Sequence, residues 1–553
     1  MSSSTHRRRI ARSAALTAAL ALVLAACAQT DDTGGGESTS SGDGGGAGGS
    51  GGITVGTTDV ITDLDPAGAY DNGSFNVAIQ VYPFLMSTPF GSSAVEPDIA
   101  ESAEFTSPTE YTVTLKDGLT FANGNELTSS DVKFSFDRMV AINDPNGPAA
   151  LLANLDSTEA PDDTTVVFRL VNGNDQTFPQ VLSSPVGPIV DEEVFAADAL
   201  TPADTIVTGN AFGGAYAITD YTENELIQYE AFEDFQGLLP ANTSPITVQY
   251  FTEETSLKLA VQEGDVDVAT RSLSPTDLAD LRGNDNVTVY DGPGGEIRYL
   301  VFNFNVQPFG TQTPEADPAK ALAVRQAVAH LLDRETLSTD IYQGTYTPLY
   351  SVIPEGLPGA TQAFKDLYGD GDGGPDADKA AKVLSDASVQ TPVALNLQYN
   401  PDHYGNSSDD EYAAIESQLE ADELFDVTLQ STLWDTYTNE RREDAYPAYQ
   451  LGWFPDFSDP DNYLTPFFLP ETNFLGNHYE SQEVNDLIRQ QSTTPDEDQR
   501  VTLIEQIQQL VAADAPTVPY LQGAQVAVAA TDITGVKDTL DASFKFRYAA
   551  LGR

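Results

Sequence analysis

The chain of 553 residues is poor in cysteine, histidine and basic side chains. Cys27 is the single cysteine, so a disulfide within the chain is excluded. The four histidines stand far apart in the sequence, which gives no support to a histidine metal cluster. Lys and Arg number 26 against 84 Asp and Glu, a formal net charge of −58. A field of this sign repels phosphate backbones, which argues strongly against a nucleic-acid-binding function.

The sequence also lacks signs of catalytic chemistry. The motifs HExxH and GxxxxGK[ST] do not occur, and a GxGxxG match within 44–49 lies in low-complexity sequence. The acidic stretch 369–381 has Pro375 where a calcium loop needs glycine and Ala381 where it needs a bidentate glutamate. We therefore expect no enzyme activity, no metal and no cofactor. A secreted acidic hydrolase with an unrecognised carboxylate pair is the alternative from another functional class.

The first 52 residues have the pattern of an export and anchoring segment. Residues 1–26 combine a basic start with the apolar run 14–26, which is too short to span a bilayer, and predict a signal peptide. The tetrapeptide LAAC ending at Cys27 matches the lipobox of bacterial lipoproteins, so we expect a lipidated Cys27 on the extracytoplasmic face of the cell membrane. Residues 27–52 read as a flexible Gly/Ser linker. Export by the Sec or the twin-arginine route stays open.

The remainder of the chain has the composition of a soluble globular protein, with 40% hydrophobic and 9% aromatic residues. Strand-like runs such as 53–57 alternate with segments of helical spacing, which predicts layers of mixed α/β structure. We expect an apolar, helical stretch over 77–86 and a helix that Ser130 and Asp131 cap. Longer helices are predicted over three segments, 318–332, 409–424 and 501–513.

The segment YQLGWFPDFSDPDNYLTPFFL (449–469) combines aromatic residues with three aspartates and with prolines that forbid a regular helix. A short strand over 449–452 would place Asp456 just beyond a strand end, where ligand-contacting loops are common. A carboxylate held against aromatic surface is poorly solvated and gains most by meeting a cation. The alternative is a proline-rich surface turn whose acids face water.

Four segments, in order, carry a resemblance to a known family. The pattern GWxxDxxDPDNYLTPFF resembles a segment of the extracytoplasmic solute-binding proteins of ABC importers, in their oligopeptide and dipeptide-binding branch. Residues 115–139, 324–354 and 376–387 are similar to three further blocks of that family. The resemblance implies an α/β, periplasmic-binding-protein-like fold of two lobes with hinge crossovers and an extra inserted domain. It also implies a monomeric binding protein that passes a peptide to ABC transporter permease subunits.

The same resemblance predicts the domain organisation. After the signal peptide and linker, we expect lobe I to comprise 53–95, 200–296 and 515–553, the inserted domain II to comprise 96–199, and lobe III to comprise 297–514. The lobe crossings are expected near 207–214, 297–305 and 515–520.

Site residues follow from the resemblance as well. Asp456 is expected to receive the α-ammonium group of the ligand, since one fixed carboxylate suits peptides of any sequence. Backbone groups around Gly452 and Phe454 would hold the ligand like an added strand. The other expected ligand contacts are Trp453, Trp434, Arg441, Tyr70, Asp71 and Asn72, with Arg441 taking a peptide carboxylate and Trp434 covering the chain. A family member that binds a nickel chelate, haem or an oligosaccharide is the alternative.

Overall fold

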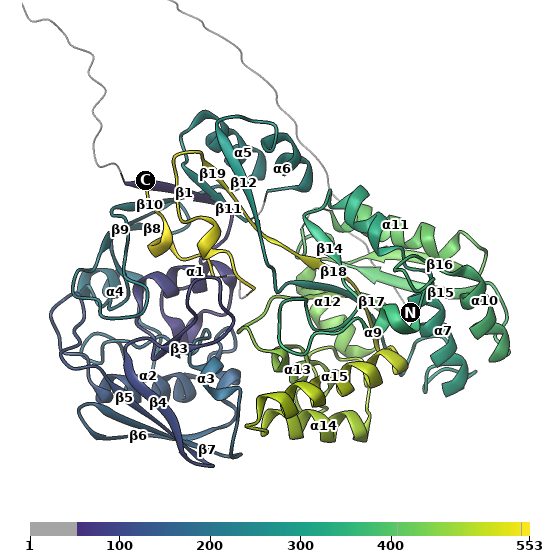
Figure 1. Ribbon diagram of the computed structural model, residues 1–553, viewed down its shortest axis with the longest axis horizontal. Helices are drawn as coiled ribbons and strands as arrows, with labels where there is room; N and C mark the ends of the chain where they lie inside the picture. Colours follow the sequence, from purple (N-terminus) through teal and green to yellow (C-terminus); the bar gives the residue numbers. More distant parts are fainter. Residues whose placement is uncertain (1–51, 272, 406, 543–544) are drawn as a thin grey trace, which may run out of the picture. The chain divides into compact units, whose positions relative to one another are not determined.

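Two large β-sheets dominate the described part of the chain (Figure 1). The structure is a computed structural model and describes residues 52–271, 273–405, 407–542 and 545–553. The predicted signal peptide 1–26, the predicted lipidation site Cys27 and the linker 27–52, apart from Gly52, lie outside the described residues.

The first sheet has seven strands. Their order is β12 (Val287–Gly292), β19 (Gln525–Ala530), β11 (Val268–Thr270), β1 (Ile53–Thr57), β10 (Ile246–Tyr250), β9 (Leu226–Ala231) and β8 (Tyr216–Thr222). β1 runs parallel to both β10 and β11 and is buried almost throughout, as expected for a parallel strand that is covered on both faces. Helices α5 (Glu254–Glu263) and α1 (Asn72–Val81) contact this sheet, α5 at β1 and α1 at β8.

The second sheet has six strands. Their order is β14 (Tyr346–Pro348), β18 (Thr517–Gly523), β13 (Ile297–Phe302), β17 (Ala448–Trp453), β15 (Val393–Tyr399) and β16 (Phe425–Ser431). β13 is fully buried and serves two cores, because successive side chains point to opposite faces. Leu300 and Phe302 join one hydrophobic cluster, and Tyr299 and Val301 join another. This sheet therefore lies between two layers of side chains, and α11 (Ser408–Glu420) packs on β16.

A third sheet is antiparallel throughout. Its order is β4 (Ala100–Ser107), β5 (Glu110–Leu115), β7 (Thr165–Leu170) and β6 (Leu155–Asp162). Helix α2 (Ser129–Ile142) packs on β6 and β7. The predicted cap at Ser130 is wrong by two residues: Thr128 is the N-cap, and its backbone N–H donates to Asp131 in a capping box.

The other elements connect these sheets and cover them. They are a small ladder of β2 (Met86–Ser87) with β3 (Glu96–Pro97) and the helices α3 (Phe178–Val181), α4 (Ala203–Gly209), α6 (Pro275–Leu281), α7 (Pro318–Leu331), α8 (Arg334–Thr336), α9 (Ala363–Leu367), α10 (Ala377–Asp386), α12 (Trp434–Glu440), α13 (Thr465–Phe468), α14 (Gln482–Ser492) and α15 (Glu497–Asp514). Figure 1 shows α14 and α15 side by side, and the two helices are in contact. No helix in the described ranges is long and apolar enough to cross a membrane.

The three long predicted helices are confirmed as α7, α11 and α15. α15 begins four residues earlier than predicted, because the Asp496 carboxylate accepts from the backbone N–H of Gln499 and caps the helix there. α1 also begins earlier than predicted, at Asn72, because Asp71 is its N-cap.

The chain passes between the two large sheets at two places, from β12 to β13 through 293–296 and from β18 to β19 through Ala524. The crossings expected near 297–305 and 515–520 lie within a few residues of these ranges, because β13 and β18 themselves are hydrogen-bonded neighbours in the second sheet. The crossing expected near 207–214 is wrong: this segment leads from α4 into β8 of the first sheet. The two crossovers touch, since a Cβ built on Gly294 would lie only 1.6 Å from the Gly523 carbonyl oxygen.

Candidate functional site

Two adjoining cavities are lined by loops of the first sheet on one side and of the second sheet on the other. We call the cavity of about 370 Å³ that contains Asp456 the carboxylate cavity. The cavity of about 570 Å³ that contains Arg298 is called the arginine cavity. Both are lined by Asp71, Asn72, Arg271, His403, Tyr404 and Phe454. One ligand can therefore contact both cavities.

Asp456 lies three residues beyond the end of β17 and is 8% exposed. Its Oδ1 accepts a hydrogen bond from the Tyr70 hydroxyl at 2.5 Å, and its Oδ2 accepts from the side-chain amide of Asn462 at 3.1 Å. Burial raises the pKa of Asp456, while the hydrogen bonds from Tyr70 and Asn462 act in the opposite direction. None of these contacts supplies a positive charge, so the carboxylate would gain by meeting a cation.

Asn462 holds the Asp456 loop in place. Its Oδ1 accepts from the Asp456 backbone N–H at 3.0 Å and from the Trp453 indole at 2.8 Å, while its amide nitrogen donates to the carboxylate. No motif in the sequence singles out Asn462. Its place in the turn η5 (Pro460–Tyr463), which Asp459 caps, brings it back over the loop.

The aspartates of this segment are buried, so the alternative of a surface turn with water-facing acids is wrong. Asp459 accepts from the backbone N–H of Asp461 at 2.8 Å and pairs with Arg500 through two bonds of 2.6 and 2.8 Å. It therefore stabilises the turn and lines neither cavity.

Eight of the nine predicted ligand contacts line the carboxylate cavity: Asp456, Trp453, Phe454, Gly452, Trp434, Tyr70, Asp71 and Asn72. Asp71 also caps α1, because its side chain accepts a hydrogen bond from the backbone N–H of Ser74 at 2.8 Å. The Gly452 carbonyl already accepts from the hydroxyls of Tyr299 and Tyr404, at 3.2 and 3.3 Å. This carbonyl is therefore not open to an added strand.

Arg441 is the exception. It is fully buried, and its Nη1 donates to the carbonyls of Phe474 and Leu475 at 2.6 and 2.9 Å. Its guanidinium lies 4.5 Å from the centre of the Phe474 ring, which does line the carboxylate cavity. Arg441 itself lines neither cavity.

Several lining residues were missed by the sequence reasoning. Arg298 stands inside the otherwise apolar strand IRYLVF, and a charged residue in such a run was the available signal. His403 stacks face to face on Trp434, with 3.8 Å between ring centres, and Tyr404 packs edge-on against the same indole. No sequence pattern connects these residues, because α11 and β16 separate them along the chain.

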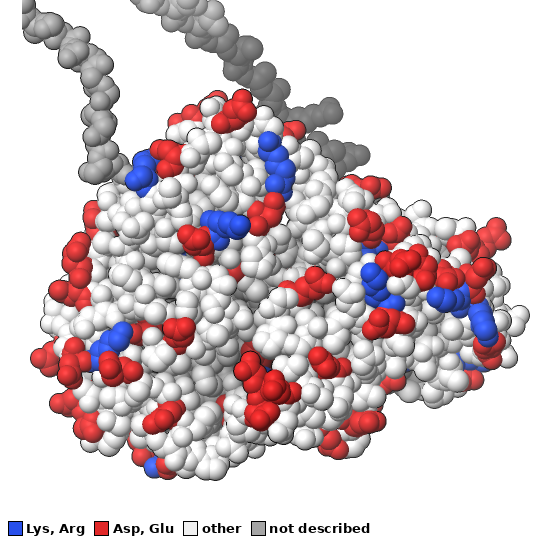
Figure 2. Space-filling model, viewed as in Figure 1, with Lys and Arg blue, Asp and Glu red and all other residues white. Residues whose placement is uncertain are grey.

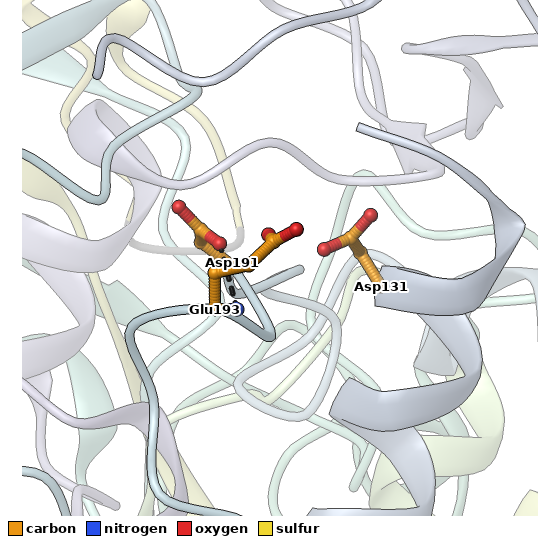
Figure 3. Close-up of side chains that lie close together, drawn as sticks. All are labelled: Asp131, Asp191 and Glu193. Carbon is orange, nitrogen blue, oxygen red and sulfur yellow. Dashed lines mark hydrogen bonds between the residues drawn. The ribbon is translucent and has the colours of Figure 1, made fainter. Parts of the chain in front are cut away.

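Figure 3 shows an acidic cluster of Asp131, Asp191 and Glu193. None of the three residues lines either cavity. Asp131 accepts from the backbone N–H groups of Thr128 and Glu192, and Asp191 accepts from the amides of Asn123 and Asn125. These bonds give both buried carboxylates a structural role. His330 of α7 is a packed core residue, 5% exposed, whose Nδ1 accepts from the Gly369 N–H at 2.9 Å.

The surface agrees with the net charge. Figure 2 shows many acidic side chains and few basic ones on the face drawn. Although the chain has few cations, two of them line the arginine cavity: the buried Arg298 and the partly exposed Arg271.

Comparison with known proteins gives a consistent picture. Residues 94–474 match the family described as bacterial extracellular solute-binding proteins, family 5 middle. The chain is 27% identical over 469 residues to a probable D,D-dipeptide-binding periplasmic protein of Escherichia coli (strain K12), covering 83% of this chain and 86% of that protein. It is 26% identical over 496 residues to the heme-binding protein A of Haemophilus influenzae (strain ATCC 51907 / DSM 11121 / KW20 / Rd), covering 82% and 84%.

A solved structure confirms the predicted fold. An ABC transporter-associated periplasmic binding protein from Helicobacter pylori, in complex with the peptide STSA, superimposes with a TM-score of 0.72. The match covers 91% of this chain and 98% of the other at 20% identity. The α/β, two-lobe fold of periplasmic binding proteins is therefore the fold of the described residues.

Proposed function

Because the chain belongs to family 5 of the bacterial extracellular solute-binding proteins, which serve ABC importers, we propose that it captures peptides outside the cytoplasm and delivers them to permease subunits. The observation that carries the proposal is the buried carboxylate of Asp456, which lines a cavity and, within the described residues, accepts side-chain hydrogen bonds from the neutral groups of Tyr70 and Asn462. Proteins of this family bind peptides or related ligands, and a peptide offers the missing cation at its amino terminus.

In this proposal the α-ammonium group of the peptide lies against Asp456. Tyr70 and Asn462 hold the two carboxylate oxygens, so the group is oriented before the ligand arrives. An α-ammonium group carries three N–H donors and a positive charge, so its hydrogen bond to the carboxylate would also be an ion pair. Every unmodified peptide has this group, so the contact is independent of sequence.

Aromatic side chains would cover the rest of the ligand. Trp434, Trp453 and Phe454 line the carboxylate cavity, and Asp71 and Asn72 lie at the boundary with the arginine cavity. Backbone groups at Gly452 and Phe454 would contact the chain, although the Gly452 carbonyl is already occupied. Arg441 would act indirectly, since it supports the ring of Phe474 from behind.

The membrane attachment is proposed from the sequence. The lipobox ending at Cys27, the basic start and the glycine-rich linker stand in the order of a bacterial lipoprotein. A lipidated Cys27 would hold a monomeric binding protein at the extracytoplasmic face, close to its permease. Such a protein binds and releases its ligand unchanged, so no catalytic residue is assigned.

The test is calorimetry of the wild-type protein with a pool of random tripeptides and with the same pool after N-acetylation. Acetylation removes the cation, so we expect the affinity to fall by about 30-fold or more. Equal affinity for the two pools would show that Asp456 does not bind an amino terminus. A non-peptide ligand of the family, such as a nickel chelate, haem or an oligosaccharide, would then be the leading hypothesis.

A further inference from the structure

Phe457 follows Asp456 in the chain, and its side chain is buried in the hydrophobic core of the third sheet. Its segment leads out of β17 in the second sheet, yet the ring is only 5% exposed. Among the described residues, the other buried members of this core all lie within 67–189, many of them on β5, β7 and α2. Phe457 therefore connects a loop of the second sheet with the core of the third sheet.

The neighbouring residues of the same loop contact the side of the first sheet. The centre of the Phe454 ring lies 5.3 Å from the guanidinium carbon of Arg271, which directly follows β11. The Asp456 carboxylate accepts the hydrogen bond from Tyr70, which precedes α1. The loop 454–457 thus makes contacts on both sides within four positions, and Asp456 lies between the two phenylalanines.

The hydrogen bonds inside this loop do not fix its place relative to the other sheets. Asn462 binds the backbone and the carboxylate of Asp456, and the Phe457 carbonyl accepts from the Asp459 N–H at 3.0 Å. These bonds give the turn its shape. Burial of an aromatic ring is among the strongest single contacts available to a loop. Because Asp456 and Phe457 share a peptide bond, the place of the ring limits the place of the carboxylate.

We propose that Phe457 is a positioning residue for ligand binding, whose ring in the third-sheet core holds the Asp456 carboxylate at the wall of the carboxylate cavity. Phe457 itself lines neither cavity, so it acts through its neighbour. The inference rests on the proposed function, because its effect on a ligand depends on an ammonium group at Asp456. It follows that the carboxylate is placed correctly only while the loop of the second sheet is seated in the core of the third sheet.

The first measurement is calorimetry of Phe457→Ala with the free and the N-acetylated tripeptide pools. The truncated loop is no longer anchored, so we expect the affinity for the free pool to fall by about tenfold or more. The affinity for the acetylated pool should change by less than about threefold, because these peptides carry no ammonium group for Asp456 to bind. A general loss of stability would weaken the binding of both pools alike, so the difference between the pools identifies a positioning role.

The second measurement needs no ligand. Hydrogen exchange of the ligand-free protein, read in proteolytic fragments that cover 454–463, should be at least about fivefold faster in Phe457→Ala than in the wild type. Failure of this inference is therefore distinguishable from failure of the proposed function. Equal affinity of the wild type for the two pools would contradict the function, whereas unchanged exchange in a folded Phe457→Ala protein would contradict the anchoring.

Phe178→Ala is the matched control. Phe178 is 2% exposed in the same core, where its ring packs edge-on against Tyr111 and Phe168, and it lines neither cavity. This variant should keep the wild-type ratio of the affinities for the free and the acetylated pool. If Phe457→Ala does not fold, Phe457→Val retains an apolar side chain and should lower that ratio by at least about threefold. An undiminished ratio in a folded Phe457 variant, or an equal loss of affinity for both pools, would overturn the inference.

Discussion

Tyr70 and Asp456, which are 386 positions apart in the chain, are joined by a hydrogen bond of 2.5 Å from the phenol to the carboxylate. Tyr70 precedes α1, which packs on the first sheet, and Asp456 follows β17 of the second sheet. The bond therefore connects the two walls of the carboxylate cavity.

Asp456→Asn should weaken peptide binding by about 30-fold or more. Truncating one partner of a buried, hydrogen-bonded charge pair costs roughly 2 to 5 kcal/mol. The variant should also lose most of the difference between free and N-acetylated peptides. Calorimetry of both pools measures the two effects together.

The matched control is Asp459→Asn, three residues away. Asp459 pairs with Arg500 and caps a turn but lines neither cavity. We expect this variant to reduce the free energy of unfolding by about 3 kcal/mol, because it breaks a largely buried ion pair, with little change in peptide affinity. A loss of affinity as large as that of Asp456→Asn would mean that the loop as a whole, and not one carboxylate, determines binding.

Peptide binding should depend on pH through Asp456. Burial raises the pKa of this carboxyl group, and a bound ammonium group lowers it again, so binding releases a proton when the free protein holds one. Affinity should be constant above the raised pKa and should fall as the pH drops through it. In the protein without ligand, the stability depends on pH in the opposite direction to the affinity. Because the pKa of Asp456 is raised in the folded state, the free energy of unfolding decreases as the pH rises through that pKa.

Titrations in two buffers of different ionisation enthalpy count the released protons. Tyr70→Phe removes a hydrogen bond that lowers the pKa of Asp456, so the loss of affinity should begin at a higher pH in this variant. Asp456→Asn should release no proton at this step. Proton release that persists in Asp456→Asn would assign the pH dependence to another group.

The sequence predicted the part of the site that is local in the chain. The strand over 449–452 followed by Asp456 came from a single segment, and β17 with its buried loop bears it out. The placement of Tyr70 beside that loop followed only from the resemblance. Arg298 was not selected from the sequence, because the rings of Tyr346 and Tyr404 that pack on its guanidinium come from parts of the chain that no spacing rule connects. Arg441 matched a spacing, yet it is fully buried, lines neither cavity and donates through Nη1 to two backbone carbonyls.

Membrane attachment should depend on Cys27. Lipidation of this residue requires its thiol, and stable anchoring requires more than one acyl chain. Cys27→Ser should therefore release the protein from washed membranes or leave it as an unprocessed precursor of higher mass. Fractionation followed by intact-mass measurement distinguishes these forms. A fully membrane-bound, processed Cys27→Ser protein would contradict the lipoprotein assignment.

Gly294→Ala should impair both stability and binding, because Gly294 and Gly523 bring the two crossovers into contact. An added Cβ would lie 1.6 Å from the Gly523 carbonyl oxygen, a distance that no packing adjustment of side chains can relieve. The crossovers would have to separate, and Gln522, whose amide donates to the Gly294 carbonyl at 2.8 Å, would lose its partner. Since these two crossovers join the walls of both cavities, we expect peptide affinity to fall by about tenfold or more, roughly 1.4 kcal/mol. We also expect the ligand-induced compaction of the wild type, measured by small-angle scattering, to be reduced.

Gly283→Ala is the matched control, because its Cβ would lie 3.4 Å from the nearest atom and Gly283 is outside the crossovers. Wild-type affinity and compaction in a folded Gly294→Ala protein would show that the contact between the crossovers does not govern closure around the ligand.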